Sequence, residues 1–93
     1  MIADPNIQRL DVRTVAEYSE EHIPGSININ VLDEQFAVIA DSTLQKDKPI
    51  ALYCRSGKRS KKAATILIRK GYKVYDLDKG FIGWKEAGKE TEK

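Results

Sequence analysis

Residues 49–71 read PIALYCRSGKRSKKAATILIRKG, and this segment predicts a strand, a loop and a helix in direct succession. It opens with an almost continuous apolar run, which is typical of a parallel strand buried on both faces. After the loop, Ala63, Ile66 and Leu67 stand at helical spacing, and Gly71 follows as the residue that ends the helix. A buried strand that leads into an amphipathic helix indicates an α/β fold with a mostly parallel sheet.

The residues before this segment predict two further strands, over 8–12 and 26–30, the second with a period of two. Thr14 and Glu17 have the spacing of a capping box, so a short helix is expected over 15–20. A turn should separate that helix from the second strand, because proline fixes φ and glycine permits a positive φ in the run His22-Ile23-Pro24-Gly25.

Three more elements complete the predicted order: a helix over 32–40, a strand over 73–77 and a helix over 81–87. The first of these helices is expected to bury one face, formed by Leu32, Phe36 and Ile39. The whole pattern predicts a small α/β fold, with a mostly parallel sheet of four or five strands and helices on both faces.

Length and composition define the class of protein. With 93 residues, the chain is expected to form a single domain over 1–93, with frayed ends at 1–7 and 89–93. Hydrophobic residues make up 41% and charged residues 32%, as in ordinary soluble proteins. No apolar run approaches the ~18 residues of a membrane span. Because no leader pattern opens the chain, a cytoplasmic location is expected, with a periplasmic one as the alternative after removal of a leader.

The chain contains one cysteine, Cys54, and one histidine, His22. A single cysteine forms no internal disulfide, and one cysteine with one histidine does not supply the ligands of a typical zinc site. We therefore expect neither a metal nor another cofactor. Any thiol chemistry must run through Cys54 and finish on another molecule.

Cys54 is the first candidate functional residue, because it stands where the apolar strand ends and the loop 55–60 begins. Ligands of open α/β sheets bind beyond the carboxyl ends of the strands. The amides of a glycine-containing loop and of the helix start that follows form an anion-binding nest, which favours a thiolate over a thiol.

Basic residues crowd the start of this helix, where the helix dipole would favour acidic ones. Five of the eight residues in 55–62 are Arg or Lys, namely Arg55, Lys58, Arg59, Lys61 and Lys62. An anion at the loop, either the Cys54 thiolate or a substrate, explains the pattern, and a solvated charged face is the alternative. Ser56 and Ser60 are expected to bind sulfur or to cap the helix, and capping is the preferred interpretation for Ser60.

Nucleic-acid binding through 55–62 is a competing hypothesis, but the net charge of +2 is weak and no aromatic side chain is interleaved in the run. We therefore expect neither a nucleic-acid nor a membrane partner.

Several motifs, in order over about residues 10–88, together resemble the rhodanese domain. They are Asp11-Val12-Arg13, Glu17-Tyr18, the run from His22 to Ile29, the run from Tyr53 to Ser60, and Gly80-Phe81 with Trp84, Ala87 and Gly88. The resemblance extends to the small single-domain bacterial sulfurtransferases of that family.

The resemblance implies a thiosulfate sulfurtransferase without a cofactor. Cys54 would take a sulfur atom from thiosulfate, release sulfite and hold the sulfur as a persulfide until cyanide or a thiol removes it. The loop around it would be Arg55, Ser56, Gly57, Lys58, Arg59 and Ser60. A thioredoxin-like or other persulfide-exchange protein is a further expected partner.

Phosphatase relatives of this superfamily have Cys-x5-Arg, whereas Cys54 and Arg59 form Cys-x4-Arg, so a phosphatase is disfavoured. Asp11 and Arg13 match a family motif and are expected to support the site, with Asp11 orienting Arg13 or capping a loop. His22 is interpreted as a turn residue rather than a general base. A persulfide relay fed by another protein and a non-catalytic binding module remain the alternative functions.

Overall fold

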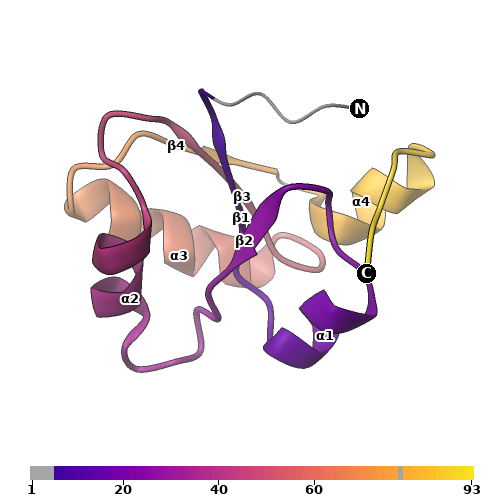
Figure 1. Ribbon diagram of the computed structural model, residues 1–93, viewed down its shortest axis with the longest axis horizontal. Coiled ribbons are helices and arrows are strands. Elements are labelled where there is room, and N and C mark those ends of the chain that lie inside the picture. Colours follow the sequence, from indigo (N-terminus) through magenta and orange to yellow (C-terminus); the bar gives the residue numbers. More distant parts are fainter. Residues whose placement is uncertain (1–5, 78) are drawn as a thin grey trace.

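Four parallel strands form the sheet of the computed structural model, which describes residues 6–77 and 79–93, in the order β2-β1-β3-β4 (Figure 1). Along the chain the elements are β1 (Gln8–Asp11), α1 (Val15–Glu20), β2 (Ser26–Asn28), α2 (Phe36–Thr43), β3 (Ile50–Tyr53), α3 (Lys58–Arg69), β4 (Val74–Asp76) and α4 (Gly80–Glu86). Because β1 and β3 are the inner strands, the apolar run before Cys54 has the central position that its composition predicts.

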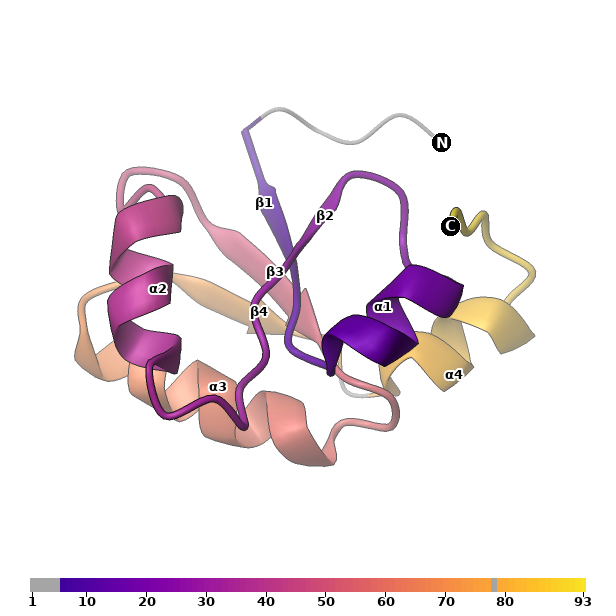
Figure 2. The same cartoon turned by 60° about the horizontal axis from the view of Figure 1, so that its bottom comes forward.

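Both faces of the sheet carry helices, as the sequence pattern predicts. Alternate side chains of the inner strands, such as Leu10 and Leu52, join the main core with residues of α2 and α3. On the opposite face, Tyr53 packs with Ile23 and with Phe81 of α4. Figure 2 shows α2 and α3 on one side of the strands and α1 and α4 on the other.

The capping box is confirmed at the start of α1. The Thr14 side chain accepts a hydrogen bond from the Glu17 amide at 3.3 Å, and the Glu17 carboxylate accepts one from the Thr14 amide at 3.1 Å. This arrangement satisfies amides that a helix start otherwise leaves without partners.

The helix predicted over 32–40 is wrong at both ends, because α2 spans Phe36–Thr43. Asn30 and Asp33 cause the late start: their side chains accept hydrogen bonds from backbone amides two residues further on, which holds turns in place of helix. Leu32 is therefore 59% exposed. Ile39, on α2 itself, is 36% exposed, so of the predicted face only Phe36 is buried, together with Ala40.

The helix predicted over 15–20 matches α1 at both ends, and the other predicted boundaries lie within two residues of the observed ones, which is the ordinary uncertainty of element ends. Gly71 follows α3 with φ of 95° and ends the helix as predicted. The fraying of residues 89–93 stays a prediction. In the structure, Glu92 forms an isolated antiparallel bridge with His22.

None of the helices that the structure describes combines the length and the apolar composition needed to cross a bilayer.

Candidate active site

Cys54 lies directly after β3, inside the turn that connects this strand to α3. Gly57 allows the turn to close, because its φ of 104° lies in the left-handed region that other residues rarely adopt. The Gly57 amide donates a hydrogen bond to the Cys54 Sγ at 3.0 Å. Only 1% of Cys54 is exposed, so the sulfur is enclosed by the loop that follows it.

The loop lowers the pKa of Cys54 below its ordinary value. Burial is the largest single influence and raises the pKa, but hydrogen bonds to the sulfur act together in the opposite direction. The Gly57 amide donates to the sulfur, and the amides of Ser60 and Ser56 and the Ser60 hydroxyl also favour the thiolate. The structure thus contains the anion nest that the sequence predicts, and it favours the thiolate.

Ser60 does not cap α3, so the preferred sequence interpretation of this residue is wrong. Gly57 occupies the capping position, and Ser60 is the third residue of the helix. The buried Ser60 hydroxyl lies 3.0 Å from the Gly57 carbonyl oxygen and also contributes to the lowered pKa of Cys54. The other role that the sequence left open for Ser60, a hydrogen bond to sulfur, stays a prediction.

Backbone amides at the start of α4 bind the backbone carbonyls of Cys54 and Arg55. The Phe81 amide donates to the Cys54 carbonyl at 2.8 Å, and the Ile82 amide donates to the Arg55 carbonyl at 3.0 Å. A Cβ atom on Gly80 would lie 2.6 Å from both carbonyl oxygens, so this close approach requires glycine. With its carbonyls bound on this side, the loop is held with its amides toward the sulfur. Gly80 and Phe81 stood in the motifs of the resemblance, but they were not among the predicted site residues.

Glu17 is a third residue, after Gly80 and Phe81, that the sequence did not place at the site. Its carboxylate accepts two hydrogen bonds from the Arg59 guanidinium, at 2.7 and 3.0 Å. Arg59, with burial acting against it, lowers the pKa of Glu17 to about 2, and Glu17 in turn raises the pKa of Arg59. The capping box was the available sequence signal for Glu17. It predicts that the Thr14 amide holds one oxygen of the Glu17 carboxylate in place.

Asp11 orients Arg13, which is one of the two roles that the sequence left open for it. The buried carboxylate accepts from Arg13 Nε at 3.0 Å and from Nη2 at 2.7 Å, and Tyr53 donates to it at 2.8 Å. Arg13 Nη2 also donates to the Glu21 carbonyl, and its guanidinium lies 4.3 Å from the centre of the Phe81 ring. The pair thus supports the wall of the site, and no contact among the described residues joins it to the Cys54 sulfur.

The exposed loop cations differ from Arg59 in having free head groups. Arg55 and Lys58 are exposed, and the described residues offer neither of them an ion pair. On the exposed face of α3, Lys61 Nζ lies 4.0 Å from an Asp76 carboxylate oxygen, and Lys62 is also exposed. Of the cations that the sequence assigned to the anion site, Arg55 lines a cavity beside the Cys54 loop, which is described next.

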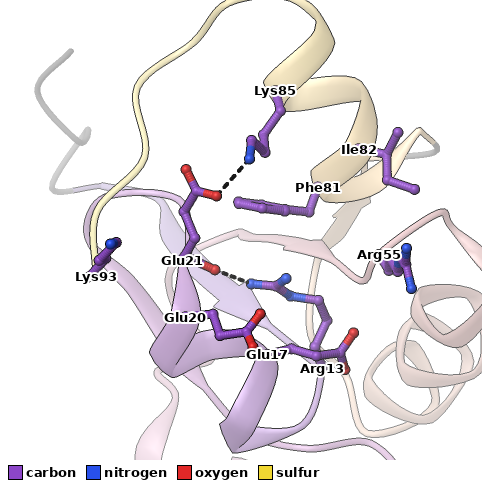
Figure 3. Close-up of a pocket in the computed structure, with 9 residues that line it drawn as sticks. All are labelled: Arg13, Glu17, Glu20, Glu21, Arg55, Phe81, Ile82, Lys85 and Lys93. Carbon is purple, nitrogen blue, oxygen red and sulfur yellow. Dashed lines mark hydrogen bonds and ion pairs between the residues drawn. The ribbon is translucent and has the colours of Figure 1, made fainter.

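A cavity of about 550 Å³ opens beside the Cys54 loop (Figure 3). It is lined by Arg13, Glu17, Glu20, Glu21, Arg55, Phe81, Ile82, Lys85 and Lys93. Its size falls within the roughly 300–1,000 Å³ of typical small-molecule sites.

His22 lies in the turn after α1 and stacks on Tyr18, with ring centres 3.7 Å apart. Its Nδ1 donates to the Tyr18 carbonyl at 2.8 Å. Among the contacts of residues 6–77 and 79–93, none joins His22 to Cys54, in keeping with the turn role that the sequence indicates. No group of three or more potential metal-ligating His, Cys, Asp or Glu side chains occurs in the described part of the chain.

Comparison with known proteins identifies the family. The family model of the rhodanese-like domain matches residues 1–87. The chain is 35% identical over 80 residues to a sulfurtransferase of Allochromatium vinosum, covering 85% of this chain and 72% of that protein. It is 36% identical over 77 residues to the thiosulfate sulfurtransferase GlpE of Coxiella burnetii, covering 81% and 68%.

A solved structure agrees with this sequence comparison. The Rhodanese_3-like domain of the Anabaena protein Alr3790 superposes with a TM-score of 0.85 at 30% identity, over 94% of this chain and 99% of that one. The buried cysteine, its amide nest and the matching fold all lead to one assignment: the chain belongs to the rhodanese-like domain family.

Proposed function

We propose that this domain transfers a sulfane sulfur from thiosulfate to a thiol, or to cyanide in an assay, through a persulfide on Cys54. The observation that carries the proposal is the Cys54 sulfur, buried in a nest of amides that lowers its pKa. A thiolate is the nucleophilic form of cysteine. The thiosulfate sulfurtransferase GlpE, at 36% identity, supports thiosulfate as the donor.

In the first step the Cys54 thiolate attacks the outer sulfur of thiosulfate. A bond forms between Sγ and that sulfur, the S–S bond of thiosulfate breaks, and its electron pair leaves with sulfite. The charge on the outer persulfide sulfur is then stabilised by the same amides of Ser56, Gly57 and Ser60 that stabilise the thiolate.

Cations guide the donor to this point. Arg55 lines the adjacent cavity without an ion-pair partner among the described residues, so its guanidinium is available to the thiosulfate dianion. Arg59 is held by Glu17 and acts on the sulfur through its charge. In the first half-reaction the persulfide forms on Cys54, and in the second an acceptor removes it. Because the first product leaves before the acceptor reacts, ping-pong kinetics are expected.

Intact-mass spectrometry tests the proposal. After incubation with thiosulfate, the wild-type chain should gain one sulfur atom and Cys54→Ser should gain none. Cyanide should then remove the sulfur and release thiocyanate. If the wild-type mass does not change, thiosulfate is not the donor. A gain seen only with a persulfide-carrying protein would assign a relay role, and no gain with either donor would assign a binding module.

A further inference from the structure

Residues 90–93 run back from α4 to the turn that follows α1, and we call this segment the strap (Figure 1). Glu92 of the strap forms an antiparallel bridge with His22, in which the amide of each residue donates to the carbonyl of the other at 2.8 Å. The Trp84 indole of α4 donates to the Glu90 carbonyl. The strap is thus bound both to α4 and to the turn.

The strap also forms part of the wall of the cavity beside the Cys54 loop. Lys93 lines this cavity, and the Thr91 hydroxyl donates to the carboxylate of Glu21, which lines it as well. A change in the position of the strap would therefore alter one side of the cavity.

The His22 ring is held at both of its nitrogen atoms. Nδ1 lies 2.8 Å from the Tyr18 carbonyl oxygen, which only accepts hydrogen bonds, so Nδ1 carries a proton. Nε2 lies 3.3 Å from Glu92 Oε1, which also accepts a hydrogen bond from the Gly25 amide at 2.9 Å. An ionised carboxylate has no hydrogen to donate, so a hydrogen bond between these two groups needs a proton on Nε2.

This geometry makes the contact depend on the charge of the ring. A neutral imidazole has one ring proton, and here Nδ1 holds it, so the lone pair of Nε2 would face the Glu92 oxygen. A protonated ring donates from both nitrogens and forms a charge-assisted hydrogen bond with the strap. Only the protonated form of His22 satisfies every contact in the structure.

The other groups on the elements around the ring do not compete for it. Tyr18 of α1 stacks on the ring with centres 3.7 Å apart, and its hydroxyl donates to the Ser26 carbonyl. The charged side chains that the structure describes nearby interact with one another: Glu21 with Lys85 and Lys93, and Arg13 with Asp11. The strap carboxylate is therefore the group whose interaction follows the charge of the ring.

We propose that the strap is a pH-sensitive closure on one side of the cavity. Protonated His22 holds Glu92 and with it the position of Lys93, and loss of the ring proton loosens the strap. The side chain of histidine ordinarily changes its charge between pH 5 and 8. The stabilisation is present at the lower end of this range and is lost as pH rises. This inference uses no property of the sulfur and does not depend on the proposed function.

Exchange of the Glu92 amide proton with water, measured by NMR on the full chain, tests the proposal. Because this amide binds the His22 carbonyl, its protection from exchange reports how much of the time the strap is docked. Rates near pH 5.5 and 7.5 are each divided by the intrinsic exchange rate at that pH. Protection should be about fivefold lower at the higher pH. The Trp84 indole resonance, the single one of its kind in this chain, should shift over the same range.

Glu92→Gln keeps the length of the side chain and removes its charge. Since this side chain is 50% exposed, the fold should tolerate the change. The variant should show the same protection at both pH values. Glu86→Gln is the matched control, because Glu86 is exposed on α4, and it should retain the fivefold difference.

Equal protection of the wild-type Glu92 amide at the two pH values would overturn the proposal. A fivefold difference that persists in Glu92→Gln would overturn it as well, because the pH dependence would then come from a group other than the pair of His22 and Glu92.

Discussion

Glu17→Gln should destabilise the fold at neutral pH and make its stability less sensitive to acid. The Glu17 carboxylate binds both Arg59 nitrogens, at 2.7 and 3.0 Å, and also accepts from the Thr14 amide at 3.1 Å. A glutamine side chain keeps the shape, but it has no charge and replaces one acceptor oxygen with a donor.

The magnitude follows from the pKa of Glu17, which is about 2 in the folded chain against 4.5 for an ordinary glutamate. Such a depression corresponds to roughly 3 kcal/mol of pH-dependent stabilisation. Because the side chain is 28% exposed, we reduce the expected loss in the variant to about 1–2 kcal/mol. For a domain of this size that loss lowers Tm by roughly 5–12 °C.

The sign of the pH dependence is also determined. A carboxylate whose pKa is lowered by folding stabilises the fold fully above its unfolded pKa, near 4.5, and the stabilisation is lost as pH falls toward 2. The difference in unfolding free energy between wild type and Glu17→Gln should therefore fall to less than about half of its neutral value by pH 3.

Urea unfolding at pH 7 and pH 3, followed by circular dichroism, measures this difference. Glu34→Gln serves as the matched control, since Glu34 is exposed in the loop before α2 and should show little difference at either pH. A destabilisation of equal size at both pH values, or none at pH 7, would refute the assignment of the stabilisation to the ionised carboxylate.

Four further predictions concern single substitutions at Ser60, Gly80, Gly71 and Tyr53. Ser60→Ala should raise the pKa of Cys54, because it removes a hydroxyl that favours the thiolate, and the pH profile of iodoacetamide alkylation should move upward. Gly80→Ala should unfold the domain or displace the Cys54 loop, since its Cβ would meet two carbonyl oxygens at 2.6 Å. Gly71→Ala, with positive φ but nothing within 4 Å, should cost only about 1 kcal/mol in the same urea titration. Tyr53→Phe should lower the unfolding free energy by about 1–3 kcal/mol, because it leaves buried groups without a partner, and an unchanged urea midpoint would contradict this.

Much of the fold was predictable from local patterns. The apolar run before Cys54 identified a central strand, the helical spacing from Ala63 identified α3, and Thr14 with Glu17 identified the start of α1. Each of these signals depends on residues a few positions apart, whose hydrogen bonds and side-chain directions are set by the local backbone.

The start of α2 was not predictable from apolar spacing. Leu32 and Phe36 have helical spacing, but the side chains of Asn30 and Asp33 bind nearby amides and hold turns instead. Periodicity records which residues are apolar and carries no information about such competing hydrogen bonds.

The sequence by itself determined the order of strands and helices along the chain and the placement of Cys54 at the end of β3. It also indicated that the backbone amides of the following loop surround the sulfur. Only the tertiary structure decided that Glu17 holds Arg59, that Gly80 lies against the Cys54 carbonyl and that Arg55 faces a cavity shared with Glu20. The physical reason is distance along the chain. Contacts within one turn follow from the backbone, whereas contacts between α1, the loop and α4 exist only after the sheet has brought these elements together.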